Sequence, residues 1–142
     1  MIDEIWDGSF TKPIKITVTR EMIAAYAKSI DIDSEIYVDI EFAKKAGYDN
    51  IPAPPTMPII FWQYFDVPWL QDAGPLIHRK QRFLNVEPLL ASRTYVCSIQ
   101  LLNVKKKQNK HGMMQLSNHK LIVSYNDCIH ATAITTLIIK EK

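Results

Sequence analysis

The feature that most constrains the fold is a nine-residue run, Met57-Pro-Ile-Ile-Phe-Trp-Gln-Tyr-Phe, that is apolar on nearly every side. Thr56 can cap a helix there, and Pro58 is tolerated in the first turn, where backbone N–H groups lack partners within the helix. A helix that is hydrophobic on all sides is expected to be buried on all sides. We therefore predict a helix over residues 56–66 that is enclosed by the rest of the chain.

Two shorter helices are predicted before this segment, and each has a residue that can cap it. Thr19 can cap the first, whose apolar residues recur at helical spacing. Asp39 can cap the second, and Gly47 can end it. Residues 14–19 alternate between apolar and polar or β-branched side chains, which predicts a short strand. The apolar positions of the first helix are Ile23, Tyr26, Ala27 and Ile30.

Three long β-rich runs follow, at residues 94–104, 113–125 and 129–139. The segments between them, 105–112 and 126–127, predict hairpin connections, so neighbouring runs are expected to pair antiparallel. An apolar helix followed by a long meander predicts an α+β fold in which one curved antiparallel sheet wraps around a central buried helix. Because the last run is apolar on both faces, we expect a partner subunit to cover the outer side of the sheet.

The composition favours one globular domain over residues 1–142, since 47% of the residues are apolar and 23% are charged. Its 17 Lys and Arg against 15 Asp and Glu leave a net charge of +2, which predicts no nucleic-acid or membrane partner. Cys97 and Cys128 lie in apolar alternating runs, so we expect small hydrophobic thiols, reduced in a cytoplasmic protein. The acidic N-terminus does not have the pattern of a secretory signal.

Several segments resemble the MaoC-like dehydratases, and specifically their N-terminal, FAS1-like dehydratase branch. The first is Thr19-Arg-Glu-Met-Ile-Ala-Ala-Tyr-Ala-Lys, and the second is Tyr37-x-Asp-x-Glu-Phe-Ala-Lys-Lys-Ala-Gly-Tyr, which is followed by Ala53-Pro-Pro-Thr. His78-x-x-Gln-x-Phe and the later Glu87-Pro-Leu also resemble the strand that follows in the family. The resemblance covers roughly residues 15–140.

The resemblance implies a hot-dog fold and an acyl thioester ligand, carried on coenzyme A or acyl carrier protein (ACP). Active members reversibly remove water from a (3R)-hydroxyacyl thioester, and an Asp and a His five positions later move the protons. A backbone N–H at the start of the buried helix holds the thioester oxygen, which assigns that role here to Pro55, Thr56 and Met57. No cofactor or metal is predicted. The resemblance implies a homodimer, or a heterodimer with a second hot-dog subunit.

The sequence departs from the family at the acid/base pair. Alignment on residues 36–39 places Tyr37 at the position of the His and Ile32 at the position of the Asp. A tyrosine, with its pKa near 10, is a poor base at neutral pH, but Tyr37 can donate a hydrogen bond to a substrate. The alternative is a buried tyrosine whose hydroxyl is already hydrogen-bonded within the protein. Asp31 and Asp33 flank the empty position and are the candidate catalytic carboxylates, if a slip in the helix end brings one of them into the site. The alternative is a helix cap or a solvated turn residue.

Two further groups are candidates for ligand contacts. His78 is expected at a strand start facing the dimer groove, where it would contact substrate; the alternative is a partly buried histidine bonded to a backbone carbonyl. The cations of residues 105–110, with Arg79, Lys80 and Arg82, could face coenzyme A phosphates or an acidic carrier protein, or could simply be solvated. The remaining histidines stand singly, so no zinc site is predicted. They are His111, His119 and His130.

The sequence thus predicts an acyl-thioester-binding protein, with the acyl-binding subunit of a hydratase or dehydratase favoured because the Asp/His pair is not intact. Two alternatives stay open. One is a non-enzymatic homodimer that binds an acyl ligand. The other is a hot-dog thioesterase, which needs only a carboxylate such as Asp31 or Asp33 to activate water.

Overall fold

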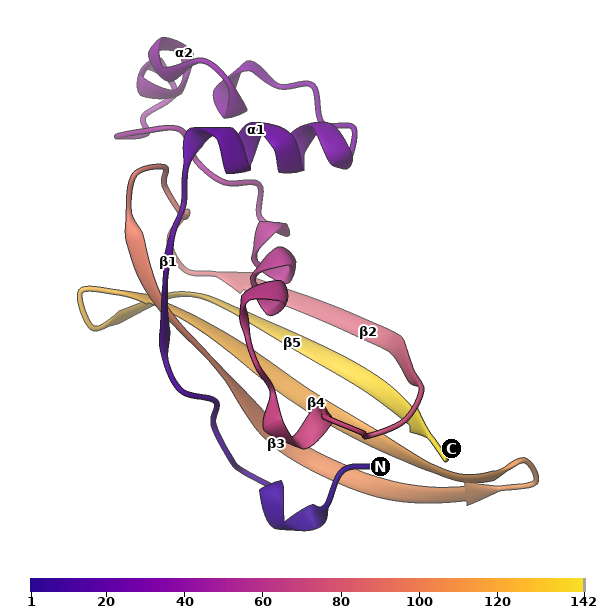
Figure 1. The fold of residues 1–142 in the computed structure, drawn as a ribbon. Helices are drawn as coiled ribbons and strands as arrows, with labels where there is room; N and C mark the ends of the chain where they lie inside the picture. The colour runs from indigo at the N-terminus through magenta and orange to yellow at the C-terminus, as the bar shows by residue number, and fades with distance from the viewer. Residues whose placement is uncertain (142) are drawn as a thin grey trace.

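Residues 1–141 are described by a computed structural model in which five strands form one antiparallel sheet, in the order β1-β3-β4-β5-β2. The strands are β1 (Ile14–Thr17), β2 (Leu76–Asn85), β3 (Thr94–Asn109), β4 (Gly112–Tyr125) and β5 (Cys128–Lys140). Figure 1 shows the long strands curving below the helical segments Arg20–Ser29 and Ile40–Lys45, with the N-terminus and the end of β5 near the same end of the sheet. The predicted α+β fold with a curved antiparallel sheet is confirmed.

The two predicted short helices form where their caps indicated. They are α1 (Arg20–Ser29) and α2 (Ile40–Lys45). Thr19 Oγ1 accepts from Met22 N at 3.0 Å, and Asp39 Oδ1 accepts from Glu41 N at 2.9 Å. Gly47 follows α2 with φ of 101°, a conformation that ends a helix at little cost for glycine.

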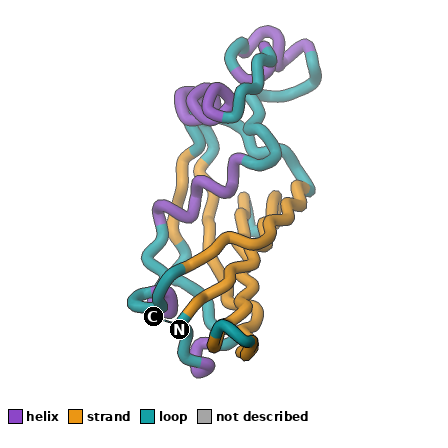
Figure 2. The backbone as a smooth tube through the Cα atoms, turned by 90° about the vertical axis from the view of Figure 1, so that its right-hand side faces the viewer, coloured by secondary structure: helices purple, strands orange, loops and turns teal. Residues whose placement is uncertain are grey.

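The remaining helical segments are short 3₁₀ turns and one longer 3₁₀ helix. They are η1 (Glu4–Trp6), η2 (Glu35–Tyr37), η3 (Met57–Tyr64) and η4 (Pro68–Leu70). Figure 2 shows η3 running along one face of the sheet, and α1 and α2 lying beyond one end of it. None of the helices between residues 1 and 141 combines the length and apolar character needed to cross a bilayer.

The two hairpins differ in how well the sequence predicted them. Asn126 and Asp127 have φ of 50° and 62°, the left-handed pair of a tight hairpin turn, which confirms that connection. The predicted loop over residues 105–112 is wrong in extent, because β3 continues to Asn109 and pairs there with Gly112. Lysines 105–107 are therefore strand residues, and the backbone pairing of β3 with β4 fixes their positions.

The inner face of the sheet forms the core together with η3. Met57 and Phe61 of η3 are fully buried, as are Leu101 of β3 and Leu121 of β4. Buried side chains alternate along β4 and β5, which assigns every second residue to the inner face. The central helix predicted from the apolar run therefore lies where the sheet curves around it.

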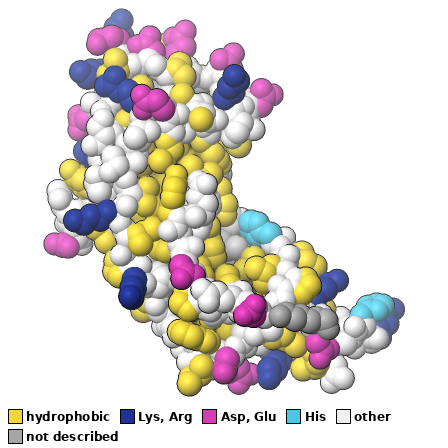
Figure 3. Space-filling view, viewed as in Figure 1, with side chains coloured by type: hydrophobic (Ala, Val, Ile, Leu, Met, Phe, Trp, Pro, Cys, Tyr) yellow, Lys and Arg dark blue, Asp and Glu magenta, His cyan; other side chains and the backbone are white. Residues whose placement is uncertain are grey.

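Two burial expectations are wrong. The helix is not enclosed on every side, because Tyr64 is 47% exposed and Ile59 and Ile60 are only half-buried. The sheet covers one side of η3, and Figure 3 shows hydrophobic side chains gathered on the open face over η3. Cys97 is buried as expected, whereas Cys128 is exposed because it begins β5 at the hairpin turn.

Candidate functional site

The start of η3 offers one backbone donor to a ligand. Pro54, Pro55 and Pro58 have no N–H, and the N–H of Met57 donates to the carbonyl of Pro54 at 3.0 Å. The N–H of Thr56 has no hydrogen-bond acceptor within residues 1–141. Of the three residues expected to hold a thioester oxygen, only Thr56 therefore has an N–H available.

The side chain of Thr56 does not cap η3, so that expectation is wrong. Its hydroxyl instead lies 2.7 Å from the hydroxyl of Tyr26 on α1. Asn85 at the end of β2 donates from Nδ2 to the carbonyl of Pro55 at 2.9 Å. These two contacts hold the start of η3 between α1 and the sheet, because its own first turn supplies no cap.

A cavity of about 330 Å³ lies beside this segment and contains Tyr37. Burial raises the pKa of Tyr37 above its usual 10, and the neighbouring Tyr48 raises it further. Tyr37 is thus a protonated hydroxyl at neutral pH, suited to hydrogen bonding rather than to proton abstraction. The cavity is lined by Ile36, Tyr37, Tyr48, Pro52, Ala53, Pro54, Pro55, Asn85, Pro88 and Leu89. None of these lining side chains is a carboxylate or an imidazole.

Asp31 and Asp33 line a second cavity, of about 400 Å³, to which Tyr37 also contributes. Asp31 follows the end of α1 and has φ of 61°. Its N–H donates to the carbonyl of Lys28 at 3.1 Å, and the N–H of the next residue, Ile32, donates to the carbonyl of Ala27 at 2.9 Å. This pair of bonds closes the helix end, so the backbone of Asp31 has a structural role. The structure thus brings both aspartates together with Tyr37, on a different cavity from Pro55.

His78 lies near the start of β2, as predicted, but away from the start of η3. Its Nε2 is 3.0 Å from Oε1 of Gln81, and Thr135 Oγ1 donates to the same oxygen at 2.6 Å. The alternative of a partly buried histidine bonded to a backbone carbonyl is wrong, because His78 is exposed and its partner is a side chain. Asn85, beside Pro55, is seven residues further along the strand, which is roughly 20 Å.

Sequence reasoning missed the role of His119, which is fully buried on the inner face of β4. Its Nε2 accepts from Trp69 Nε1 at 2.9 Å, and its ring meets Trp62 edge-on with centroids 5.4 Å apart. Burial lowers the pKa of His119 from 6.5 to about 4, so the ring is neutral at pH 7. The signal in the sequence that could have placed it is its spacing of two residues from Leu121, which is itself two residues from Val123. No cluster of three or more potential metal-ligating His, Cys, Asp or Glu side chains occurs in residues 1–141.

A curved antiparallel sheet packed around an apolar helix is the arrangement of the hot-dog class of proteins. The family model for the FAS1-like, dehydratase domain region matches residues 6–127, and the chain belongs to this family. The resemblance to MaoC-like dehydratases seen in the sequence is therefore confirmed.

Similar curated proteins are known from several bacteria. The chain is 28% identical to a UPF0336 protein of Thermobifida fusca over 138 residues, covering 93% of this chain and 89% of that protein. It is 29% identical to a UPF0336 protein of Leifsonia xyli over 129 residues, covering 87% of this chain and 85% of that protein.

Solved structures confirm the hot-dog fold. A chain of the HadBC (3R-hydroxyacyl-ACP dehydratase) complex of Mycobacterium tuberculosis matches with a TM-score of 0.76 and 22% identity, covering 94% of this chain and 96% of that one. A chain of the ChsH1-ChsH2 complex of the same organism matches with a TM-score of 0.75 and 22% identity, covering 94% and 89%. Both neighbours are subunits of complexes.

Proposed function

We propose that this chain is the acyl-thioester-binding subunit of a (3R)-hydroxyacyl dehydratase or enoyl hydratase, and that a second hot-dog subunit supplies the acid/base pair. The ligand is an acyl group carried on coenzyme A or acyl carrier protein. The observation that carries the proposal is the cavity beside η3. Its lining is mainly apolar with Tyr37, Tyr48 and Asn85 as polar groups, and it includes no group suited to proton transfer at neutral pH.

The positions of the family's acid/base pair support the same division of labour. Tyr37 stands at the position of the histidine, and its pKa is raised by burial, so it stays protonated. Ile32 stands at the position of the aspartate and carries no ionisable group. In this proposal the N–H of Thr56 holds the thioester oxygen, and Tyr37 donates a hydrogen bond to the bound acyl group.

The partner would pair along the open edge of β2. This ten-residue strand pairs only with β5, and apolar side chains at its end are strongly exposed: Leu84 is 64% exposed and the adjacent Val86 is 63% exposed. A long edge of this kind is a template for pairing with another chain. The half-covered side of η3 adds an apolar surface that the same partner would bury (Figure 3).

If the partner is a second copy of this chain, such pairing would also give His78 a role. An antiparallel pair of β2 strands centred near Gln81 would place His78 of one subunit opposite the end of β2 in the other subunit. The Pro55–Met57 segment is held at that end by Asn85. His78 would then act across the interface, although within one chain it lies far from the cavity.

The test uses the purified chain with crotonyl-CoA and longer trans-2-enoyl-CoAs, following loss of conjugated absorbance and release of free thiol in parallel. Alone, the chain is expected to bind the thioesters without turning them over. Co-expression with a hot-dog subunit that carries the Asp and His should produce hydration without thiol release. Tyr37→Phe should weaken binding about 3- to 10-fold, because it removes one hydrogen bond. Tyr125→Phe is the matched control, since Tyr125 lines neither cavity.

Other results would favour the alternatives. Thiol release by the chain alone, abolished by Asp33→Asn, would support a thioesterase, for which the cavity shared by Asp31, Asp33 and Tyr37 is the relevant observation. Binding by a homodimer that no second subunit activates would support a non-enzymatic ligand-binding protein. Absence of thioester binding would overturn all three functions.

A further inference from the structure

Charge is segregated within this nearly neutral chain. Strands β2 to β5 contain eight Lys and Arg residues and no Asp or Glu. The acidic residues lie in the helical segments, the loops and the termini. The net charge of +2 is therefore the sum of a cationic sheet and acidic segments outside it. The electrostatic potential at each face of the sheet depends on which way the Lys and Arg side chains point.

Two register shifts turn cations of β2 and β3 to the same face. In β3, Leu101 is opposite His119 and Asn103 is opposite Asn118, so Leu102 is an extra residue without a partner. This insertion turns Lys105 and Lys107 to the outer face of the sheet. Without this shift, strict alternation from the buried Leu101 would point both lysines inward. Irregularities that re-aim side chains in this way are recurrent features beside binding sites.

The register shift in β2 likewise turns a cation to the outer face of the sheet. His78 is opposite Leu137 and Lys80 is opposite Thr136, which leaves Arg79 as the extra residue. Arg79 and Lys80 consequently both line the outer groove, although they are neighbours in sequence. The cations of the two strands thus face one another across β4 and β5.

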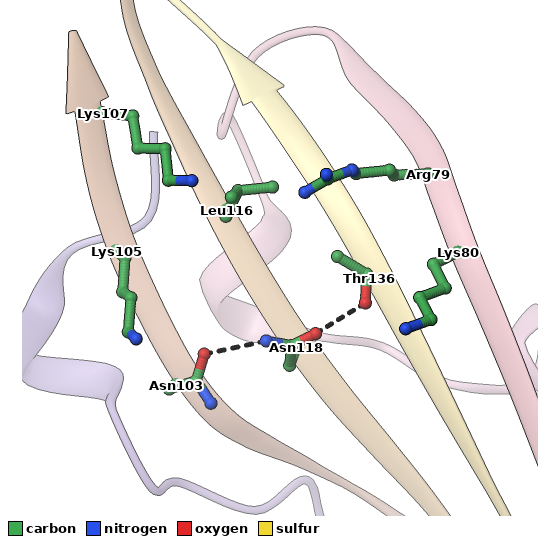
Figure 4. A pocket seen from close by; sticks show the side chains of 8 residues that line it. All are labelled: Arg79, Lys80, Asn103, Lys105, Lys107, Leu116, Asn118 and Thr136. Atoms are coloured by element: carbon green, nitrogen blue, oxygen red, sulfur yellow. Dashed lines mark hydrogen bonds between the residues drawn. The ribbon is translucent and has the colours of Figure 1, made fainter.

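The result is a groove of about 480 Å³ on the outer face, which we call the basic groove. Figure 4 shows Lys107 and Arg79 extending toward each other from opposite sides, with Lys105 and Lys80 further along the same two strands. No acidic side chain lines the basic groove. The four cations of the groove therefore have no counter-charge in its lining, and a bound anion would supply one.

The floor of the basic groove also offers a hydrogen-bond donor. Thr136 Oγ1 donates to Asn118 Oδ1 at 2.6 Å, and Asn118 Nδ2 donates to Asn103 Oδ1 at 3.0 Å. This chain of bonds uses the acceptor oxygens of both amides, and the Nδ2 of Asn103 has no acceptor within the described part of the chain. The groove therefore offers donors on its floor and cations on both walls.

We propose that the basic groove binds an organic diphosphate of nucleotide size, at a site separate from the acyl cavity. Phosphate oxygens match a site made of donors and cations, and guanidinium groups such as Arg79 can bind them in a bidentate manner. The volume lies in the range of small-ligand sites, and Leu116 adds an apolar contact within the groove. Because η3 packs on the inner face, this ligand would bind independently of an acyl group held there.

The test is a calorimetric titration of the full chain at low salt with ADP and pyrophosphate, and with adenosine as the uncharged comparison. ADP and pyrophosphate are expected to bind saturably at one site per chain and to raise the melting temperature, and adenosine should do neither. The double variant Arg79→Gln/Lys105→Gln should weaken ADP binding by at least about tenfold, because it removes one cation from each wall.

The matched control is Lys106→Gln/Lys110→Gln, which makes the same change in net charge. Lys106 is opposite the inward-facing Gln115, and Lys110 lies in the hairpin turn, so neither lines the basic groove. Equal weakening by both double variants would overturn the proposal, since binding would then follow overall charge. No saturable binding of ADP or pyrophosphate would also overturn it, as would binding of an RNA oligonucleotide in their place.

Discussion

Acid should destabilise this protein through one buried side chain, His119. The ring is fully buried on β4 and accepts a hydrogen bond from Trp69 Nε1, and burial lowers the pKa of His119 to about 4. In the unfolded chain the same ring titrates with its ordinary pKa of 6.5. The unfolded state therefore binds a proton at a pH where the folded state does not.

The size and direction of the effect follow from linkage. Above pH 6.5 both states are neutral at this ring, and the stability that the neutral ring contributes is fully present. As the pH falls toward 4, the free energy of unfolding decreases by about 1.4 kcal/mol per pH unit, because only the unfolded state gains the proton. The pKa values of 6.5 and about 4 give a total loss of about 3 kcal/mol.

Urea unfolding measured between pH 7.5 and 4 by tryptophan fluorescence would test this. His119→Gln keeps a hydrogen-bond acceptor near Trp69 and cannot titrate, so its stability should lack this loss of about 3 kcal/mol on acidification. His111→Gln, in the exposed hairpin turn, is the control and should follow the unmodified chain. Parallel pH dependence in the chain and in His119→Gln would refute the reasoning.

Three further outcomes are expected. Asp31→Gly should raise the free energy of unfolding by up to about 1 kcal/mol in urea melts, because φ of 61° suits glycine; Asp31→Ala should lower it, and a loss with glycine would mean that the aspartate side chain is needed. Phe61→Ala should cost about 3 to 5 kcal/mol, since Phe61 is fully buried in η3, and a cost below about 1 kcal/mol would contradict its place in the core. In thiol labelling of the native protein, exposed Cys128 should react and Cys97 should not, because burial raises the pKa of Cys97 to about 12; two fast thiols would refute this.

The parts of the fold that sequence predicted well depend on neighbouring residues. The caps by Thr19 and Asp39 and the turn at Asn126 and Asp127 each use contacts within a few residues, so the local sequence contains the information they need. The β-rich runs were also placed correctly, apart from the extension of β3 to Asn109. That extension comes from pairing with β4. The lysine-rich sequence at the end of β3 does not by itself predict a strand.

The candidate site was predictable only in outline. The family resemblance directed attention to Tyr37 and to the Pro55–Met57 segment, and the structure places Tyr37 and Pro55 on one cavity. It did not indicate that Met57 N–H is already bonded to a neighbouring carbonyl, or that the hydroxyl of Thr56 contacts α1. Asn85 was not singled out at all, since nothing near it in sequence suggests that it holds Pro55.

By itself, the sequence determined the class of this protein: an apolar helix, a long antiparallel meander, and two short helices, α1 and α2, with their predicted caps. Only the tertiary structure decided which side chains meet. His119 is a buried hydrogen-bond acceptor for Trp69, and lysines of β3 face Arg79 of β2 across the outer face of the sheet. The reason is that the face on which a strand residue lies depends on register, and one extra residue reverses it for all that follow. Register is set by pairing between distant strands, which local patterns do not encode.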